Sequence, residues 1–179
     1  MTRDSYIKAL SRIIWGYIFI YININIGVLD ILPNWLGYVF IINALDVVYE
    51  AKHSVLSLKT HCVLLGIWNG TLWISSLIGI SSSINIISII ISIVELYFHF
   101  MLLTLIWKIS KDHGCCTNNR LKQLRNIWTI LMTIFAIPAN WNNYIFLKYG
   151  VIVAILVVVI WICGVLLSYR YAEKALLDV

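Results

Sequence analysis

Long runs of apolar residues are the feature that most constrains this 179-residue chain. A membrane-spanning helix needs about 20 consecutive residues that are mostly apolar, and six stretches of the sequence approach that length. We therefore predict an all-α, polytopic bundle of six transmembrane helices, which forms a single integral membrane domain over residues 1–179. The predicted spans are residues 6–28, 33–49, 59–80, 84–108, 124–139 and 145–169, of which the second and fifth are short.

The composition favours the same class of protein. Hydrophobic residues make up 61% of the chain and charged residues 12%, whereas a soluble domain carries about 25% charged residues. This balance excludes a soluble globule, a disordered tail and a coiled coil. The four cysteines are too few for a disulfide scaffold. The net charge of +5 comes without any nucleic-acid-binding motif, so we expect no nucleic-acid partner.

The basic residues predict the orientation of the chain. Twelve of the thirteen precede or open the first span, follow the sixth, or lie in the second-to-third and fourth-to-fifth connections; Lys148 alone falls on the other side. Cytoplasmic loops are enriched in Lys and Arg, so six spans would place both termini in the cytoplasm. The basic start and the apolar run that follows it lack a small-residue cleavage site, which indicates a retained first span rather than a signal peptide.

Polar residues inside the predicted spans fall on single helix faces. In the fourth span they recur every three or four residues, at Asn85, Ser88, Ser92, Glu95 and His99. Glu95 and His99 are four residues apart, so their side chains can meet. A carboxylate at mid-bilayer costs about 2.5–3.5 kcal/mol, so Glu95 must be protonated, paired, or exposed to a water-filled cavity.

We expect polar faces of the second, third and fourth spans to converge on an interior site. Asp46, Glu95 and His99 would be its ionisable members. The full set of candidate ligand or ion-binding residues is Glu95, His99, Asp46, Asn43, Glu50, Asn69 and Ser92. The alternative is structural, because polar side chains on neighbouring membrane helices also hydrogen-bond simply to hold the helices together. Gly66 and Gly70 in the third span have the spacing that lets helices approach closely.

A second group of candidates lies at the predicted outer rim. Aromatic faces and amide groups there would line an external pocket formed by Asp30, Asn34, Trp35, Trp141 and Asn143. The alternative is an interfacial belt, in which tryptophans at span ends, including Trp107 and Trp128, sit at the membrane surface.

The sequence predicts no catalytic residue, no bound metal and no cofactor. The segment from Glu95 to His99 supplies one acid and one His, whereas zinc hydrolases need two His and a further ligand. His113, Cys115 and Cys116 form a candidate soft-metal or redox patch, but adjacent cysteines suit tetrahedral chelation poorly. We expect free thiols there, and we rank an intramembrane enzyme third among the functions.

The run Asn25-Ile26-Gly27-Val28-Leu29-Asp30-Ile31-Leu32-Pro33-Asn34-Trp35-Leu36-Gly37-Tyr38 resembles a segment of small multi-pass membrane proteins from Gram-positive bacteria. The resemblance covers the first two spans and implies no catalytic residue. In size, span number and internal termini, the chain is also similar to the substrate-binding subunits of energy-coupling-factor vitamin transporters. Those subunits carry an Ala-xxx-Ala pair in the first helix, where this chain has Ala9 and Ile13.

Together these patterns indicate a non-enzymatic protein of a bacterial cell membrane. The leading hypothesis is a small-solute binding or transport-like subunit with an interior polar site. The alternative is a structural or regulatory accessory protein of the immunity type, whose basic segment 108–125 contacts a membrane-protein partner or anionic lipid. The expected partners are the lipid bilayer together with a small solute or a second membrane protein.

Overall fold

The computed structural model describes residues 2–22, 25–26, 29–30, 33–49, 55–79, 86–112, 120–136 and 145–175. Helices dominate this part of the chain, which confirms the all-α class. They are α1 (Arg3–Tyr21), α2 (Asn34–Tyr49), α3 (Leu56–Leu77), α4 (Ile86–Asp112), α5 (Arg120–Ala136) and α6 (Ile145–Ala175).

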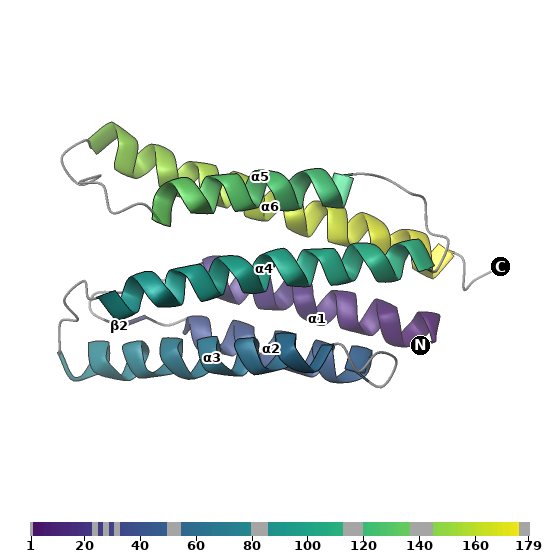
Figure 1. Ribbon diagram of the computed structural model, residues 1–179, viewed down its shortest axis with the longest axis horizontal. Coiled ribbons are helices and arrows are strands. Elements are labelled where there is room, and N and C mark those ends of the chain that lie inside the picture. Colours follow the sequence, from purple (N-terminus) through teal and green to yellow (C-terminus); the bar gives the residue numbers. More distant parts are fainter. Residues whose placement is uncertain are drawn as a thin grey trace.

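The helices pack in chain order and close into a ring. Each helix contacts the next one along the chain, and α6 packs back against α1. In Figure 1, α1 and α4 run through the middle of the bundle, with α2 and α3 on one side and α5 and α6 on the other. Successive helices run in opposite directions, so α1 begins and α6 finishes at the same end.

Local signals account for several helix ends. Thr2 caps α1, because its Oγ1 accepts a hydrogen bond from the Ser5 amide at 3.3 Å. Gly79 follows the end of α3 with a φ of +78°, a left-handed conformation that glycine adopts without strain. Helices α4 and α6 continue past the predicted apolar runs to Asp112 and Ala175, since a helix does not have to stop where its hydrophobic segment does.

The first predicted span is too long. Helix α1 stops at Tyr21 rather than at residue 28, and two short strands follow it, β1 (Asn25–Ile26) and β2 (Leu29–Asp30). They pair antiparallel, with Asn25 opposite Asp30. The alternating Asn-Ile sequence before Gly27 suits a strand better than a helix, because alternation places like side chains on one face of extended backbone.

Glycines bring α1, α2 and α3 close together. A Cβ atom added to Gly37 would lie 2.5 Å from the Gly16 carbonyl oxygen, and one added to Gly16 would lie 2.9 Å from the Gly37 oxygen. Gly66 and Gly70 of α3 face α2, where they lie against Tyr38 and Trp35. The small-residue spacing predicted to allow close approach is therefore used inside the bundle.

The outer surface of the bundle is apolar. Large hydrophobic side chains are exposed on every helix, and the most exposed aliphatic ones are Ile67 (65%), Ile78 (68%) and Ile160 (69%). Two of the described helices are long and apolar enough to cross a membrane, over Ile87–Asp112 and Val153–Tyr171. The helix Asn34–Tyr49 is apolar but shorter. Length and composition therefore support two of the six predicted spans.

The remaining helices fall short for identifiable reasons. Helices α1 and α5 carry charged residues in their first two turns. These include Asp4 and Lys8 in α1, and Lys122 and Arg125 in α5. Helix α3 carries Asn69 and several Ser and Thr residues among its apolar ones. These groups lower the mean hydropathy of each helix, and α5 is also short, at 17 residues. The crossing of the membrane by all six helices therefore stays a prediction.

Candidate functional site

Among the described residues, one imidazole is fully buried in the interior of the bundle, that of His99 on α4. Two tyrosines of α1 approach it from the facing helix. The Tyr21 hydroxyl lies 2.8 Å from His99 Nε2, and the Tyr17 hydroxyl lies 3.2 Å from His99 Nδ1. Both ring nitrogens are thus hydrogen-bonded, as a polar group in an apolar interior requires.

Aromatic rings enclose this imidazole. The rings of Tyr17, Tyr21 and Phe98 have centroids 5.3, 5.7 and 5.2 Å from that of His99. Trp128 of α5 contacts it edge-on at 5.9 Å and also contacts the Tyr21 ring. Trp128 is fully buried, and its Nε1 has no hydrogen-bond partner among the described residues. The interpretation of Trp128 as an interfacial residue is therefore wrong.

Glu95 connects the buried imidazole to the outside of the bundle. Its Oε1 accepts a hydrogen bond from the Tyr38 hydroxyl of α2 at 3.4 Å and lies 3.8 Å from His99 Nε2. The Glu95 side chain is 32% exposed, whereas that of His99 is 1% exposed. We refer to Tyr17, Tyr21, Tyr38, Glu95 and His99 as the polar cluster. It joins α1, α2 and α4, with Glu95 as a partly exposed member.

The polar cluster can hold a proton in more than one place. A neutral imidazole has one donor and one acceptor nitrogen, so one tyrosine then donates to it and the other accepts from it. An imidazolium would instead donate to both hydroxyls, with the Glu95 carboxylate 3.8 Å away as its counter-charge. Tyrosine hydroxyls donate and accept equally well, so the same contacts serve both forms.

The rest of the predicted stripe on α4 does not reach this cluster. The Ser92 hydroxyl donates to the Ser88 carbonyl of its own helix at 2.9 Å, and Ser92 is exposed. Asn85 lies outside the described residues. This half of α4 is little covered by other helices, since Ile87, Ile90 and Ile93 are more than half exposed. Of the described stripe, His99 is buried and Glu95 is partly buried against it.

The acidic residue of α2 lies elsewhere, which corrects the expectation that Asp46 joins Glu95 and His99. The Asp46 carboxylate pairs with Lys59 of α3 at 2.5 Å, and both side chains are partly exposed. Asn43 is exposed as well, and its carbonyl oxygen accepts a hydrogen bond from the Arg12 guanidinium at 2.8 Å. Glu50 lies outside the described residues.

Two further sets of candidates are placed apart from the polar cluster. Asn69 on α3 is partly buried, and its amide donates to the Leu65 carbonyl of its own helix at 2.9 Å. At the predicted rim, Trp35 stacks edge-on with Trp73 at 6.4 Å. Buried polar atoms of this rim, Asn34 Oδ1 and Trp35 Nε1, have no partner in the described part of the chain. Asp30 is described only as part of β2, and Trp141 and Asn143 lie outside the described residues.

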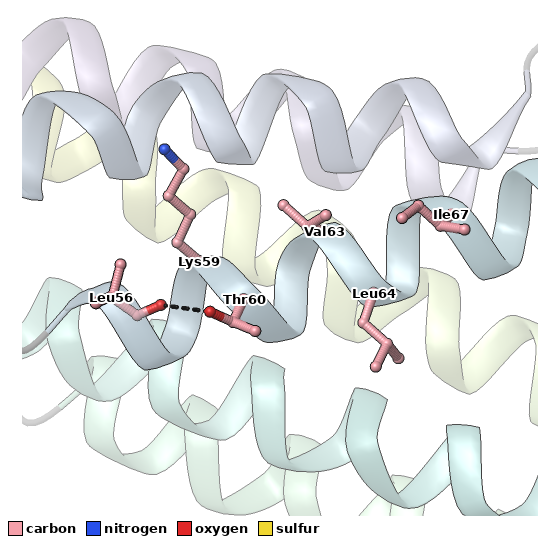
Figure 2. Close-up of a pocket in the computed structure, with 6 residues that line it drawn as sticks. All are labelled: Leu56, Lys59, Thr60, Val63, Leu64 and Ile67. Carbon is pink, nitrogen blue, oxygen red and sulfur yellow. Dashed lines mark hydrogen bonds between the residues drawn. The ribbon is translucent and has the colours of Figure 1, made fainter.

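An open hollow of about 480 Å³ lies on α3, away from the polar cluster. Figure 2 shows its six lining side chains, which all belong to this helix, with Leu64 pointing to the opposite side from Lys59 and Val63. The lining residues are Leu56, Lys59, Thr60, Val63, Leu64 and Ile67. Within the described ranges, no group of three or more His, Cys, Asp or Glu residues is arranged to hold a metal ion. His113, Cys115 and Cys116 lie outside those ranges.

The sequence prediction missed the tyrosines and the tryptophan of the site. Tyr17 and Tyr21 are four residues apart in the middle and last part of the first apolar run, away from its charged start. Tyrosine is expected near a membrane surface. A tyrosine away from the ends of a predicted span therefore indicates that its hydroxyl faces a polar partner inside the bundle.

The chain is an all-α bundle of helices in which a hydrogen-bonded polar cluster is surrounded by apolar and aromatic side chains. No family model, no curated protein and no solved structure matches it.

Proposed function

We propose that the chain is a non-enzymatic integral membrane protein that crosses a bacterial cell membrane six times. The apolar outer surface supports this proposal, because soluble proteins rarely expose large contiguous apolar patches. Here exposed Ile, Leu and Val side chains cover α3, α4, α5 and α6. Their exposure is unfavourable in water and favourable against lipid tails.

The direction of the helices supports cytoplasmic termini. Most basic residues of the described helices lie toward the end of the bundle where α1 begins and α6 finishes, among them Lys59, Lys108, Lys122 and Arg170. Lys148 is in the first turn of α6, at the opposite end. One positively charged end is the arrangement expected of a protein oriented by its cytoplasmic Lys and Arg residues.

Within this membrane protein, we assign the polar cluster the role of a binding site for a small solute or ion. The observation that carries the assignment is the position of Glu95. Its carboxyl group is partly exposed, accepts a hydrogen bond from the Tyr38 hydroxyl, and lies next to the fully buried His99. Ionisable residues inside membrane proteins most often mark solute or ion pathways. The partly exposed carboxyl would meet the ligand first, and the imidazole would share the charge.

The test is a binding measurement on the purified full-length protein. Thermal unfolding in detergent is followed for the wild type, Glu95→Gln and Asp46→Asn across a panel of cations and small amines, amides and acids. A ligand that binds the native state raises the unfolding midpoint. We expect at least one panel member to stabilise the wild type and Asp46→Asn equally, and to leave Glu95→Gln unaffected.

Asp46→Asn is a suitable control because it removes a carboxylate from the same membrane protein without touching the polar cluster. The assignment fails if Glu95→Gln responds to every panel member as the wild type does. A protein that remains soluble without detergent would contradict the membrane proposal itself, whatever it binds.

A second candidate function is that of an accessory subunit that acts by contact with another membrane protein. The open hollow on α3 favours it, since four of its six lining side chains are apolar and exposed. In-membrane crosslinking from Val63→Cys and Ile67→Cys distinguishes the two functions. A single crosslinked partner protein supports the accessory role, and crosslinking to lipid alone opposes it.

A further inference from the structure

The guanidinium of Arg125 on α5 is held rigidly by neutral groups of two helices. Its Nη1 donates to Thr104 Oγ1 of α4 at 3.1 Å, and its Nε and Nη2 donate to Asn126 Oδ1 at 3.2 and 3.0 Å. The charged carbon lies 4.5 Å from the ring centroid of Phe100, also on α4. These contacts hold the Arg125 guanidinium in one orientation between α4 and α5.

The positive charge of Arg125 has no carboxylate among these partners. Three of its N–H groups are used, so two of the five remain to donate. Its partner Thr104 lies four residues before residue 108, the predicted end of the fourth span, which places the guanidinium roughly 6 Å inside that span at about 1.5 Å per residue. A membrane-embedded cation at this depth is costly unless an anion or water reaches it.

Two lysines lie between Arg125 and the end of the bundle. Lys108 is one turn beyond Thr104 on α4, and Lys122 is three residues before Arg125 on α5. Both are exposed. Because α4 and α5 run in opposite directions (Figure 1), both lysines lie toward the same positively charged end. We refer to Lys108, Lys122 and Arg125 as the basic seam.

We propose that the basic seam binds the phosphate of an anionic phospholipid in the leaflet that faces this end of the bundle. A guanidinium with two unused N–H groups matches the geometry of a phosphate oxygen pair. Phe100 and the exposed Met101 beside the seam suit an acyl chain. The inference rests on the proposed membrane location but not on any role of the polar cluster.

The experiment measures lipid binding directly. Full-length protein in detergent is titrated with phosphatidylglycerol or with phosphatidylcholine, and bound lipid is counted by native mass spectrometry. We expect phosphatidylglycerol to bind about tenfold more tightly than phosphatidylcholine, which is the usual scale of one charge-assisted contact. Arg125→Gln should lose most of that preference. Arg125→Lys, which keeps the positive charge but not the paired N–H groups of the guanidinium, should lose part of it.

Lys111→Gln provides the matched control. Lys111 is a nearby exposed cation on α4, but its ammonium lies over the Trp107 ring at 5.6 Å rather than in the seam. This variant should keep the preference within about twofold of the wild type. Glu95→Gln should bind phosphatidylglycerol as the wild type does, which separates a failure of this inference from a failure of the solute site.

Four outcomes overturn the inference. The first is equal binding of the two lipids by the wild-type protein, a result that needs no variant to fold. The second is an unchanged preference in Arg125→Gln. The third is displacement of phosphatidylglycerol by excess inorganic phosphate, which would assign the basic seam to free phosphate. The fourth is loss of a co-purifying acidic membrane protein in Arg125→Gln without any lipid preference, which would assign the basic seam to a protein partner.

Discussion

Helix α1 is joined to α2 and to α4 in two different ways. Against α2 it packs backbone to backbone, with Gly16 and Gly37 so close that neither position has room for a Cβ atom. Against α4 it is joined by long side chains, since Tyr6 bonds to Ser110 at 2.5 Å and Tyr17 and Tyr21 bond to His99. One interface depends on shape and the other on hydrogen bonds.

The difference shows what each contact demands of the sequence. Close backbone packing gains van der Waals energy over many atoms, so it tolerates any sequence that keeps both positions small. A side-chain hydrogen bond between two helices needs a donor and an acceptor at matching positions along both helices. If a substitution removes one of these groups, the other is left buried without a hydrogen-bond partner. Substitutions at the two interfaces should therefore differ in size and in how they are rescued.

The largest effect is expected for Gly37→Ala at the α1–α2 interface. The new Cβ would meet the Gly16 carbonyl oxygen at 2.5 Å, a backbone atom that can move only if the helices separate. We expect a loss of about 3 kcal/mol in unfolding free energy, at the upper end for overpacking. Equilibrium unfolding in detergent measures it.

Gly164→Ala is the control for that substitution, because no described atom lies within 4 Å of its added Cβ. It should leave the unfolding free energy unchanged or slightly raised. Equal destabilisation by both substitutions would show that the glycines act through helix flexibility and not through close approach.

The next largest effect is expected for His99→Leu in the α1–α4 bridge. It leaves the Tyr17 and Tyr21 hydroxyls buried without this partner, which should lower the unfolding free energy by about 2 kcal/mol. Adding Tyr17→Phe and Tyr21→Phe should recover most of the loss, since removing both sides of a buried hydrogen bond is close to neutral. A triple variant less stable than His99→Leu alone would refute the bridge.

A smaller effect is expected for Tyr6→Phe at the other end of the same interface. The substitution removes the hydroxyl that bonds Ser110 Oγ and donates to the Ile106 carbonyl at 3.3 Å, while the ring stays in place. We expect a loss of about 1 kcal/mol. Ser110→Ala should cost a similar amount, and the double variant should cost less than the sum of the two.

The smallest effect is expected for Asp46→Asn, which breaks the ion pair with Lys59. Both side chains are partly exposed, and pairs of this kind contribute less than about 1 kcal/mol. Thermal unfolding at low and high salt measures the contribution. A cost as large as that of His99→Leu would show that the α2–α3 pair is part of the structural core.

The helices could be predicted from the sequence because their signals are local. The second span, predicted over residues 33–49, appears as Asn34–Tyr49, and α3, α4 and α5 begin and end within four residues of their predicted spans. Helix α6 begins as predicted and ends six residues later, at Ala175. The exception is the end of α1, where Asn25–Ile26 and Leu29–Asp30 form a short strand pair. Apolar content alone does not distinguish a helix from an extended segment.

The candidate site could be predicted only where its members are close in the chain. Glu95 and His99 meet as their spacing of four indicates. Asp46 shares their chemistry but pairs with Lys59, 13 residues away. The partners that His99 does have, Tyr21 and Tyr17, are 78 and 82 residues distant, and no periodicity along one helix specifies which face of another it will meet.

The sequence by itself determined six helices, their apolar faces and the concentration of positive charge at one end. Each of these follows from hydrophobic periodicity and from the order of charged residues along the chain. The tertiary structure alone decided that tyrosines of α1 hold the imidazole of α4 and that Asp46 lies outside that cluster. Those pairings depend on how closely the glycines of α1 and α2 let the helices approach, and thus on the rotation of each helix in the bundle.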